Sequence, residues 1–230
     1  MATVPASLAR SAPPPSSPPL DWTIADLLEQ LGGVPPRRVR WVPTPGTATE
    51  KDVIETEART GRICELIDGV LVEKTMGSYE SAVAAAMIYF LKTYLRRRRL
   101  GVVLAPDGLL RILPRQVRVP DVAFLSWTRL GGRRWKRQPI LAAAPDLAVE
   151  VLSKGNTKAE MKRKLRDYFT AGVRLVWFID PRTRTAQSYV GPEQFQSIGE
   201  NGALSGGDVL PGFKLALRDL FAETEGTDAE

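Results

Sequence analysis

The order of the elements in the sequence predicts a mixed β-sheet flanked by helices, a fold of the α/β or α+β class. A long helical pattern spans residues 78–99, several short apolar runs typical of strands follow it, and a capped helix at 157–172 precedes a final strand pair. With 230 residues, 43% of them hydrophobic, the chain can bury one full core. We expect a single domain over residues 20–222, between a disordered Pro- and Ser-rich tail at 1–19 and a flexible acidic tail at 223–230.

The N-terminal third alternates helical and irregular patterns. Apolar residues at helical spacing over 21–31, ended by two glycines, predict a short peripheral helix. The proline-rich stretch 35–46 is expected to be irregular, with Trp41 and Val42 in an edge strand. Residues 53–60 are expected to form a second short helix.

Two strand-like runs, 64–67 and 70–73, are joined by Asp68-Gly69, which is a strong signal for a β-hairpin. The longest helix is predicted at 78–99, where apolar residues form a stripe and four arginines end the pattern, as the helix dipole favours. Further strands are expected at 102–105, 109–113, 122–125 and 147–152.

The next helix has clear start and stop signals. Thr157 with Glu160 three residues later forms a capping box, and Gly172 ends the helix. A buried strand at 175–179 and its partner at 186–190 follow, and apolar residues between 209 and 221 are expected to close the core.

The residue inventory excludes several kinds of chemistry. Histidine is absent and cysteine occurs only as Cys64, so Ser-His and Cys-His pairs, histidine bases, thiolate zinc clusters and internal disulfides are excluded. A metal must therefore bind oxygen, which favours Mg²⁺, Mn²⁺ or Ca²⁺. The single cysteine fits a reducing compartment, so cytoplasmic localisation is expected. The longest apolar stretch, 82–91, is far shorter than the roughly 20 residues of a membrane span.

The charge distribution predicts an acidic partner. The net charge is +6 with a pI near 9.6, which favours encounter with polyanions. The basic residues also cluster, at Arg96 to Arg99 and around Trp135. The second cluster, which we expect to contact nucleic-acid phosphates, consists of Arg133, Arg134, Lys136 and Arg137.

Two carboxylates stand where strands are expected to be buried. Glu150 interrupts the apolar run 145–153, and Asp121 lies at the mouth of the run that follows Pro120. A buried lone carboxylate is costly, and a divalent cation between two of them relieves their repulsion, so the pair predicts a metal site. The alternatives are that Asp121 caps a turn and that Glu150 pairs with a buried arginine.

A basic group near such a metal would stabilise charge on a phosphate and position the attacking water. At about 100° per residue, the helix after Glu150 directs Met161, Leu165 and Tyr168 inward, with Lys164 at the edge of that face. Lys158 faces inward one turn earlier, so both lysines are candidates, and either can equally be a surface cation.

In combination, several segments resemble the Uma2 family, formerly a domain of unknown function, of the PD-(D/E)XK nuclease superfamily. The resemblance covers roughly residues 37–221. Its motifs are the hairpin CELIDGVLVE, the VPDV around Asp121, the PDLAVEVLS around Glu150, Lys164 through Tyr168 to Gly172-Val173, and Trp177 to Pro181.

The resemblance implies a restriction-endonuclease-like core in which Asp121 and Glu150 hold a divalent metal, Mg²⁺ or Mn²⁺, with the backbone carbonyl of Val151 as a further ligand. The superfamily's lysine two residues after the glutamate is Leu152 here, and Lys164 matches the family position better than Lys158. An additional acid would come from Glu80, near the start of the first core helix, or from Glu65 in the hairpin, which can equally face solvent.

The resemblance therefore implies a metal-dependent endonuclease acting on nucleic acid, with DNA as the expected substrate and a homodimer as the expected assembly by analogy. The alternative is a protein that keeps the nuclease fold as a nucleic-acid-binding or assembly module without cutting. Leu152 and the lack of the first-helix histidine support that alternative.

Overall fold

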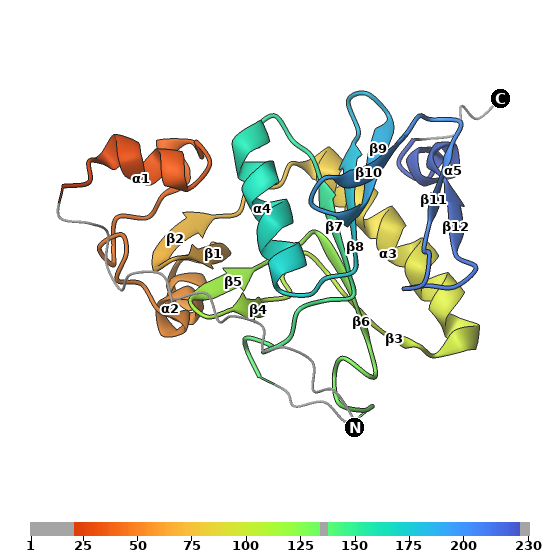
Figure 1. Ribbon diagram of the computed structural model, residues 1–230, viewed down its shortest axis with the longest axis horizontal. Coiled ribbons are helices and arrows are strands. Elements are labelled where there is room, and N and C mark those ends of the chain that lie inside the picture. Colours follow the sequence, from red (N-terminus) through yellow and green to blue (C-terminus); the bar gives the residue numbers. More distant parts are fainter. Residues whose placement is uncertain (1–20, 134–137, 226–230) are drawn as a thin grey trace, which may run out of the picture.

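The computed structural model describes residues 21–133 and 138–225, and it forms a mixed α+β fold with two main β-sheets and helices against them (Figure 1). The larger sheet has six strands in the order β10-β9-β8-β7-β6-β3. Their bounds are β3 Gly101–Leu104, β6 Val122–Ser126, β7 Leu147–Val151, β8 Leu175–Asp180, β9 Thr185–Gly191 and β10 Gln194–Ile198. Only β7 and β8 run parallel, which the intervening helix α4 (Lys158–Thr170) allows.

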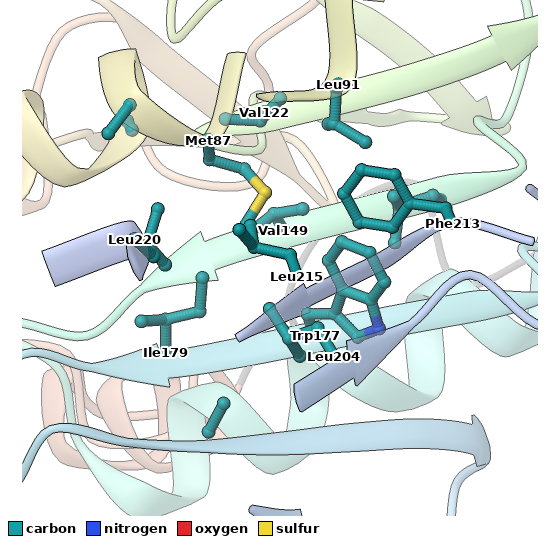
Figure 2. Packing of buried hydrophobic residues seen from close by; sticks show 14 of the residues in the cluster. Met87, Leu91, Val122, Val149, Trp177, Ile179, Leu204, Phe213, Leu215 and Leu220 are labelled. Atoms are coloured by element: carbon teal, nitrogen blue, oxygen red, sulfur yellow. The ribbon is translucent and has the colours of Figure 1, made fainter. Parts of the chain in front are cut away.

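The two faces of this sheet carry different covers, because side chains alternate along each strand. Val149 and Trp177 point to the face covered by α3 (Ser78–Arg98), by α5 (Leu217–Ala222) and by the hairpin of β11 (Ala203–Ser205) and β12 (Lys214–Ala216). Figure 2 shows Trp177 and Phe213 at the centre of this layer, where their rings stack with centroids 5.8 Å apart.

The opposite face is covered by α4. Met161, Leu165 and Tyr168 of this helix pack on Ala148, Val176 and Phe178 of the sheet. The capping box of Thr157 and Glu160 is present and α4 ends just before Gly172, as the sequence predicts. Glu150 lies on the same face of β7 as Ala148, so it points towards α4.

The smaller sheet is antiparallel and lies on the other side of α4 (Figure 1). Its strands follow the order β2-β1-β5-β4, with bounds β1 Cys64–Ile67, β2 Val70–Glu73, β4 Leu110–Leu113 and β5 Gln116–Arg118. The predicted hairpin is confirmed: Asp68 and Gly69 join β1 to β2 with positive φ angles of 51° and 82°. The helices α1 (Ile24–Gln30) and α2 (Glu50–Thr60) flank this sheet, with the short 3-10 helix Pro36–Arg38 between them.

Some elements differ from expectation. Trp41 and Val42 lie outside every strand and are 64% and 81% exposed, so the predicted edge strand is wrong, and only the preceding Val39 forms a single bridge to Val72. Four short strands were not expected, namely β5, β10, β11 and β12. In β10 all residues except Ile198 are exposed, so the strand lacks the alternation by which sequence reasoning finds strands.

Several expectations fall on residues that the structure does not describe: the N-terminal tail 1–19, the end of the acidic tail, and Arg134, Lys136 and Arg137. Within the described ranges, none of the helices is long and apolar enough to cross a membrane.

The end of α1 packs against the first turn of α4 through a glycine. Gly32 has a φ of 83°, and a Cβ placed on it would lie 2.6 Å from the backbone N and Cα of Glu160. Gly33 has a φ of 68°, and a Cβ placed on it would have no other atom within 4 Å among the described residues. Gly33 is therefore a matched control for the packing of Gly32.

We expect Gly33→Ala to lower the free energy of unfolding by about 1–2 kcal/mol, the cost of a left-handed residue. Gly32→Ala should lower it by about 2–5 kcal/mol, because a clash with the α4 backbone is added. Urea unfolding measures both values, and equal losses would contradict the packing described for Gly32.

Candidate functional site

Asp121 and Glu150 meet on neighbouring strands of the six-stranded sheet. The register of β6 and β7 pairs Val122 with Val149, so its continuation by one residue sets Asp121 opposite Glu150. Asp121 Oδ2 accepts a hydrogen bond of 2.6 Å from the backbone N–H of Val151, which joins the two strand ends. The two acids are only 4% and 5% exposed. Two residues that are 29 apart in the sequence thus form one buried acidic pair.

Each acid of this pair contacts a lysine. Lys74, which follows β2, places Nζ 2.8 Å from Asp121 Oδ1 and donates a hydrogen bond of 2.5 Å to the carbonyl of Val119. Lys164 of α4 places Nζ 2.9 Å from Glu150 Oε2. The Tyr168 hydroxyl, one turn further along α4, donates to Glu150 Oε1 at 2.5 Å. The partner of Glu150 is thus a lysine and not the buried arginine that the sequence analysis gave as the alternative.

Glu65 joins the same cluster from the smaller sheet. Its Oε1 lies 3.0 Å from Lys164 Nζ and accepts a 3.0 Å hydrogen bond from the backbone N–H of Val119. Its Oε2 pairs with Arg118 at 2.8 Å, and Arg118 also pairs with Asp167 of α4. Glu65 is 3% exposed, so the alternative that it faces solvent is wrong.

Electrostatics fixes the protonation of Lys164. Burial alone would lower its pKa, but the carboxylates of Glu150 and Glu65 outweigh burial and raise the pKa above its ordinary value. Burial raises the pKa of Glu150 and of Tyr168. Burial also acts to raise the pKa of Glu65, but Lys164 and Arg118 together hold that pKa below its ordinary value. Lys164 is thus a permanent positive charge that donates hydrogen bonds and does not accept a proton at neutral pH.

The two remaining candidates from the sequence lie apart from this cluster. Glu80 lies in the first turn of α3, which covers the opposite face of the sheet. Lys158, predicted to face inward, is exposed because it is the first residue of α4.

Arg133, the one described member of its predicted basic cluster, lines a separate basic groove. This groove has a volume of about 540 Å³ and lies where α3 ends and β3 begins. Its other basic lining residues are Lys92, Arg96 and Arg99. Gly101 of this groove pairs with Ser126, at the end of β6, whereas Asp121 lies at the start of the same strand. At about 3.3 Å per residue, the two ends of the strand are roughly 16 Å apart. The groove therefore suits contacts to the backbone of a long polyanion.

The cluster also contains two residues that sequence reasoning missed. Arg118 lies in β5, one of the four strands that were not expected, although the alternating pattern of residues 116–119 could have indicated it. Lys74 follows a hairpin strand, and no local pattern distinguishes it from a surface lysine. Only the approach of the two sheets brings it onto Asp121.

The donor set around Asp121 suits a hard cation. Lys74 Nζ is held by one carboxylate oxygen and one carbonyl oxygen, so a cation already occupies a position between oxygen donors. Among the described residues, no three His, Cys, Asp or Glu side chains are grouped to hold a metal. A divalent ion would therefore depend on Asp121, Glu150 and the carbonyl of Val151, all hard oxygen ligands that suit Mg²⁺ or Mn²⁺.

Removing Lys164 should leave Glu65 and Glu150 buried without their shared cation. We expect Lys164→Met to lower the free energy of unfolding by about 3–5 kcal/mol at neutral pH. The loss should shrink as the pH falls towards 5, because without Lys164 the pKa of Glu150 rises further above its ordinary value and the folded state takes up a proton that the unfolded state does not. Chemical denaturation at several pH values measures this, and a loss independent of pH would contradict the ion-pair geometry.

Comparisons with known proteins place this geometry in a family. The profile of the Uma2 family, described as "putative restriction endonuclease", matches residues 52–218. A crystal structure of a "putative nuclease belonging to DUF820" from Anabaena variabilis ATCC 29413 is similar in fold, with a TM-score of 0.64. It is 19% identical and the alignment covers 72% of this chain and 93% of that one. No curated protein matches the chain. The family match spans more than half of the chain and includes both Asp121 and Glu150, so this protein belongs to the Uma2 family.

Proposed function

We propose that the protein is a divalent-metal-dependent endonuclease that hydrolyses phosphodiester bonds of DNA. The observation that carries the proposal is the buried pair of Asp121 and Glu150 with the charged Lys164 in contact with Glu150. The family description and the name given to the similar crystal structure support nuclease chemistry. The basic groove beside β3 supports a polyanionic substrate.

Asp121, Glu150 and the Val151 carbonyl would hold the metal, which supplies Lewis-acid activation of a phosphate oxygen and lowers the pKa of a bound water. Lys164 remains protonated, so its part is to donate hydrogen bonds to the phosphate or the water and to balance developing negative charge. Tyr168 and Glu65 fix the positions of Glu150 and of the Lys164 ammonium.

Lys74 has a separate part in this proposal. It pairs with Asp121 Oδ1, and its side chain is 10% exposed, compared with 7% for that of Lys164. Rotation of its flexible stem towards solvent would free that oxygen for the metal. The displaced ammonium would then be available to a substrate phosphate.

A second candidate function is nucleic-acid binding or assembly without cleavage. Leu152 stands where the superfamily has its lysine, and each acid of the central pair already contacts a lysine, which supports this alternative. Isothermal titration with Mg²⁺ and Mn²⁺ separates the two. Heat of binding that is lost in Asp121→Asn supports the nuclease, whereas no heat together with salt-dependent DNA binding supports the second candidate.

We expect the purified protein to nick plasmid DNA in the presence of Mg²⁺ or Mn²⁺ and to stop when the metal is chelated. Asp121→Asn and Glu150→Gln should each lower the rate by at least about 100-fold, because each removes a metal ligand but keeps the side-chain volume. Asp219→Asn, an exposed acid on α5, is the control and should cut like the parent. Unimpaired nicking by both site variants would refute the assignment.

Light scattering tests the homodimer that we propose for cleavage of both strands. A monomer that still linearises DNA would contradict the need for two sites in one assembly.

A further inference from the structure

A second groove opens directly beside the acidic pair. It has a volume of about 450 Å³ and lies between the first half of α4 and the strands β8, β9 and β10. In the register of the parallel pair, Phe178 of β8 is the partner of Glu150. Phe178 lines the groove, and neighbouring strands lie about 4.8 Å apart, so the groove begins one strand away from the carboxylate. Leu152 and Ser153, which follow Glu150 and Val151, line it as well.

Three aromatic rings form the floor of this groove. Phe178 and Tyr189 have centroids 5.1 Å apart, and Tyr189 and Phe195 are also 5.1 Å apart with their planes inclined by 31°. The inner two side chains are buried, whereas Phe195 of β10 is 52% exposed. A large apolar ring is therefore presented to solvent at the outer end of a row that starts beside Glu150.

The wall and rim of the groove are polar and mainly basic. Lys158 and Lys162 project from the first turns of α4, and Arg182 follows β8. Two acids also line the groove, but Asp180 is paired with Arg182 at 2.8 Å and Glu193 lies 3.9 Å from Lys162. The three cations outnumber the two acids, so the lining favours a ligand that combines a flat apolar face with negative charge.

We propose that this groove binds one unpaired nucleobase of the strand that is cut, stacked on Phe195, with the adjoining phosphates near Lys158 and Lys162. This inference rests on the proposed function, whose substrate it makes more specific. Every nucleobase has a face that stacks on an aromatic ring, and its phosphates match the basic wall. A base inside a duplex is already stacked on both faces and paired at its edge, so it enters only after leaving the helix. Preferred substrates are therefore single strands, flaps and junctions.

The experiment uses a short single-stranded oligonucleotide with one 2-aminopurine, whose fluorescence is quenched by stacking. Binding is measured with EDTA present, so that no cleavage is needed. We expect the parent protein to quench the probe, and Phe195→Ala to weaken binding on the order of 5- to 150-fold and to remove most of the quenching. Phe195→Trp should restore both properties, because it again offers an aromatic face.

Val190→Ala is the matched control. Val190 neighbours Tyr189 in β9, is 64% exposed and points to the opposite face of the strand, so its replacement should leave the affinity unchanged. The proposal would be overturned if Phe195→Ala bound the oligonucleotide as tightly as the parent, or if Val190→Ala lost as much affinity as Phe195→Ala. It would also be overturned if binding quenched the probe equally in a fully paired duplex and in the single strand. Metal-dependent nicking is measured separately, so a failure of base stacking is distinguished from a failure of the nuclease assignment.

Discussion

The ammonium of Lys164 is the interaction on which the rest of the site depends. It contacts Glu65 of the smaller sheet and Glu150 of the larger one, and it belongs to the helix that lies between them. Three buried charges from three elements thus satisfy one another in a region from which water is largely excluded. Any one of them left alone would carry a large desolvation cost, so the two sheets and α4 must assemble together.

Leu152 stands where the superfamily that this chain resembles has a lysine, and the same cluster offers another source of that positive charge. A lysine on α4 reaches the same carboxylate from a different backbone position, because α4 returns over the face of the sheet to which Glu150 points. In the proposed function, a positive charge near the metal needs a location and a protonation state, and its place in the sequence is free to change. The carboxylates around Lys164 supply the protonation state, and the packing of Leu165 and Tyr168 supplies the location.

The elements that sequence reasoning found have local causes. The Asp68-Gly69 turn, the capping box at Thr157 and the apolar runs of β6 and β7 depend on residues a few positions apart, and each was predicted close to its observed bounds. The elements it missed have weaker local signals. The strand β10 is almost wholly exposed, so its sequence has no apolar alternation, and β5 is only three residues long with a buried arginine. The sequence predicted an edge strand at Trp41 and Val42, but in the structure neither residue belongs to a strand.

By itself, the sequence determined that Glu150 interrupts one buried strand, that Asp121 stands at the start of another, and that any metal here must bind oxygen, since those conclusions need only residue types and short-range patterns. Periodicity left Lys164 and Lys158 as equal candidates, and the sequence left open whether Glu65 supplies an additional acid or faces solvent. Tertiary structure decided that Lys164 is buried between two carboxylates, that Lys158 is exposed, and that Lys74 and Arg118 complete the cluster. The physical reason is that a buried charge finds its partners through space, and here the partners of Lys164 are 14 residues away at Glu150 and 99 residues away at Glu65.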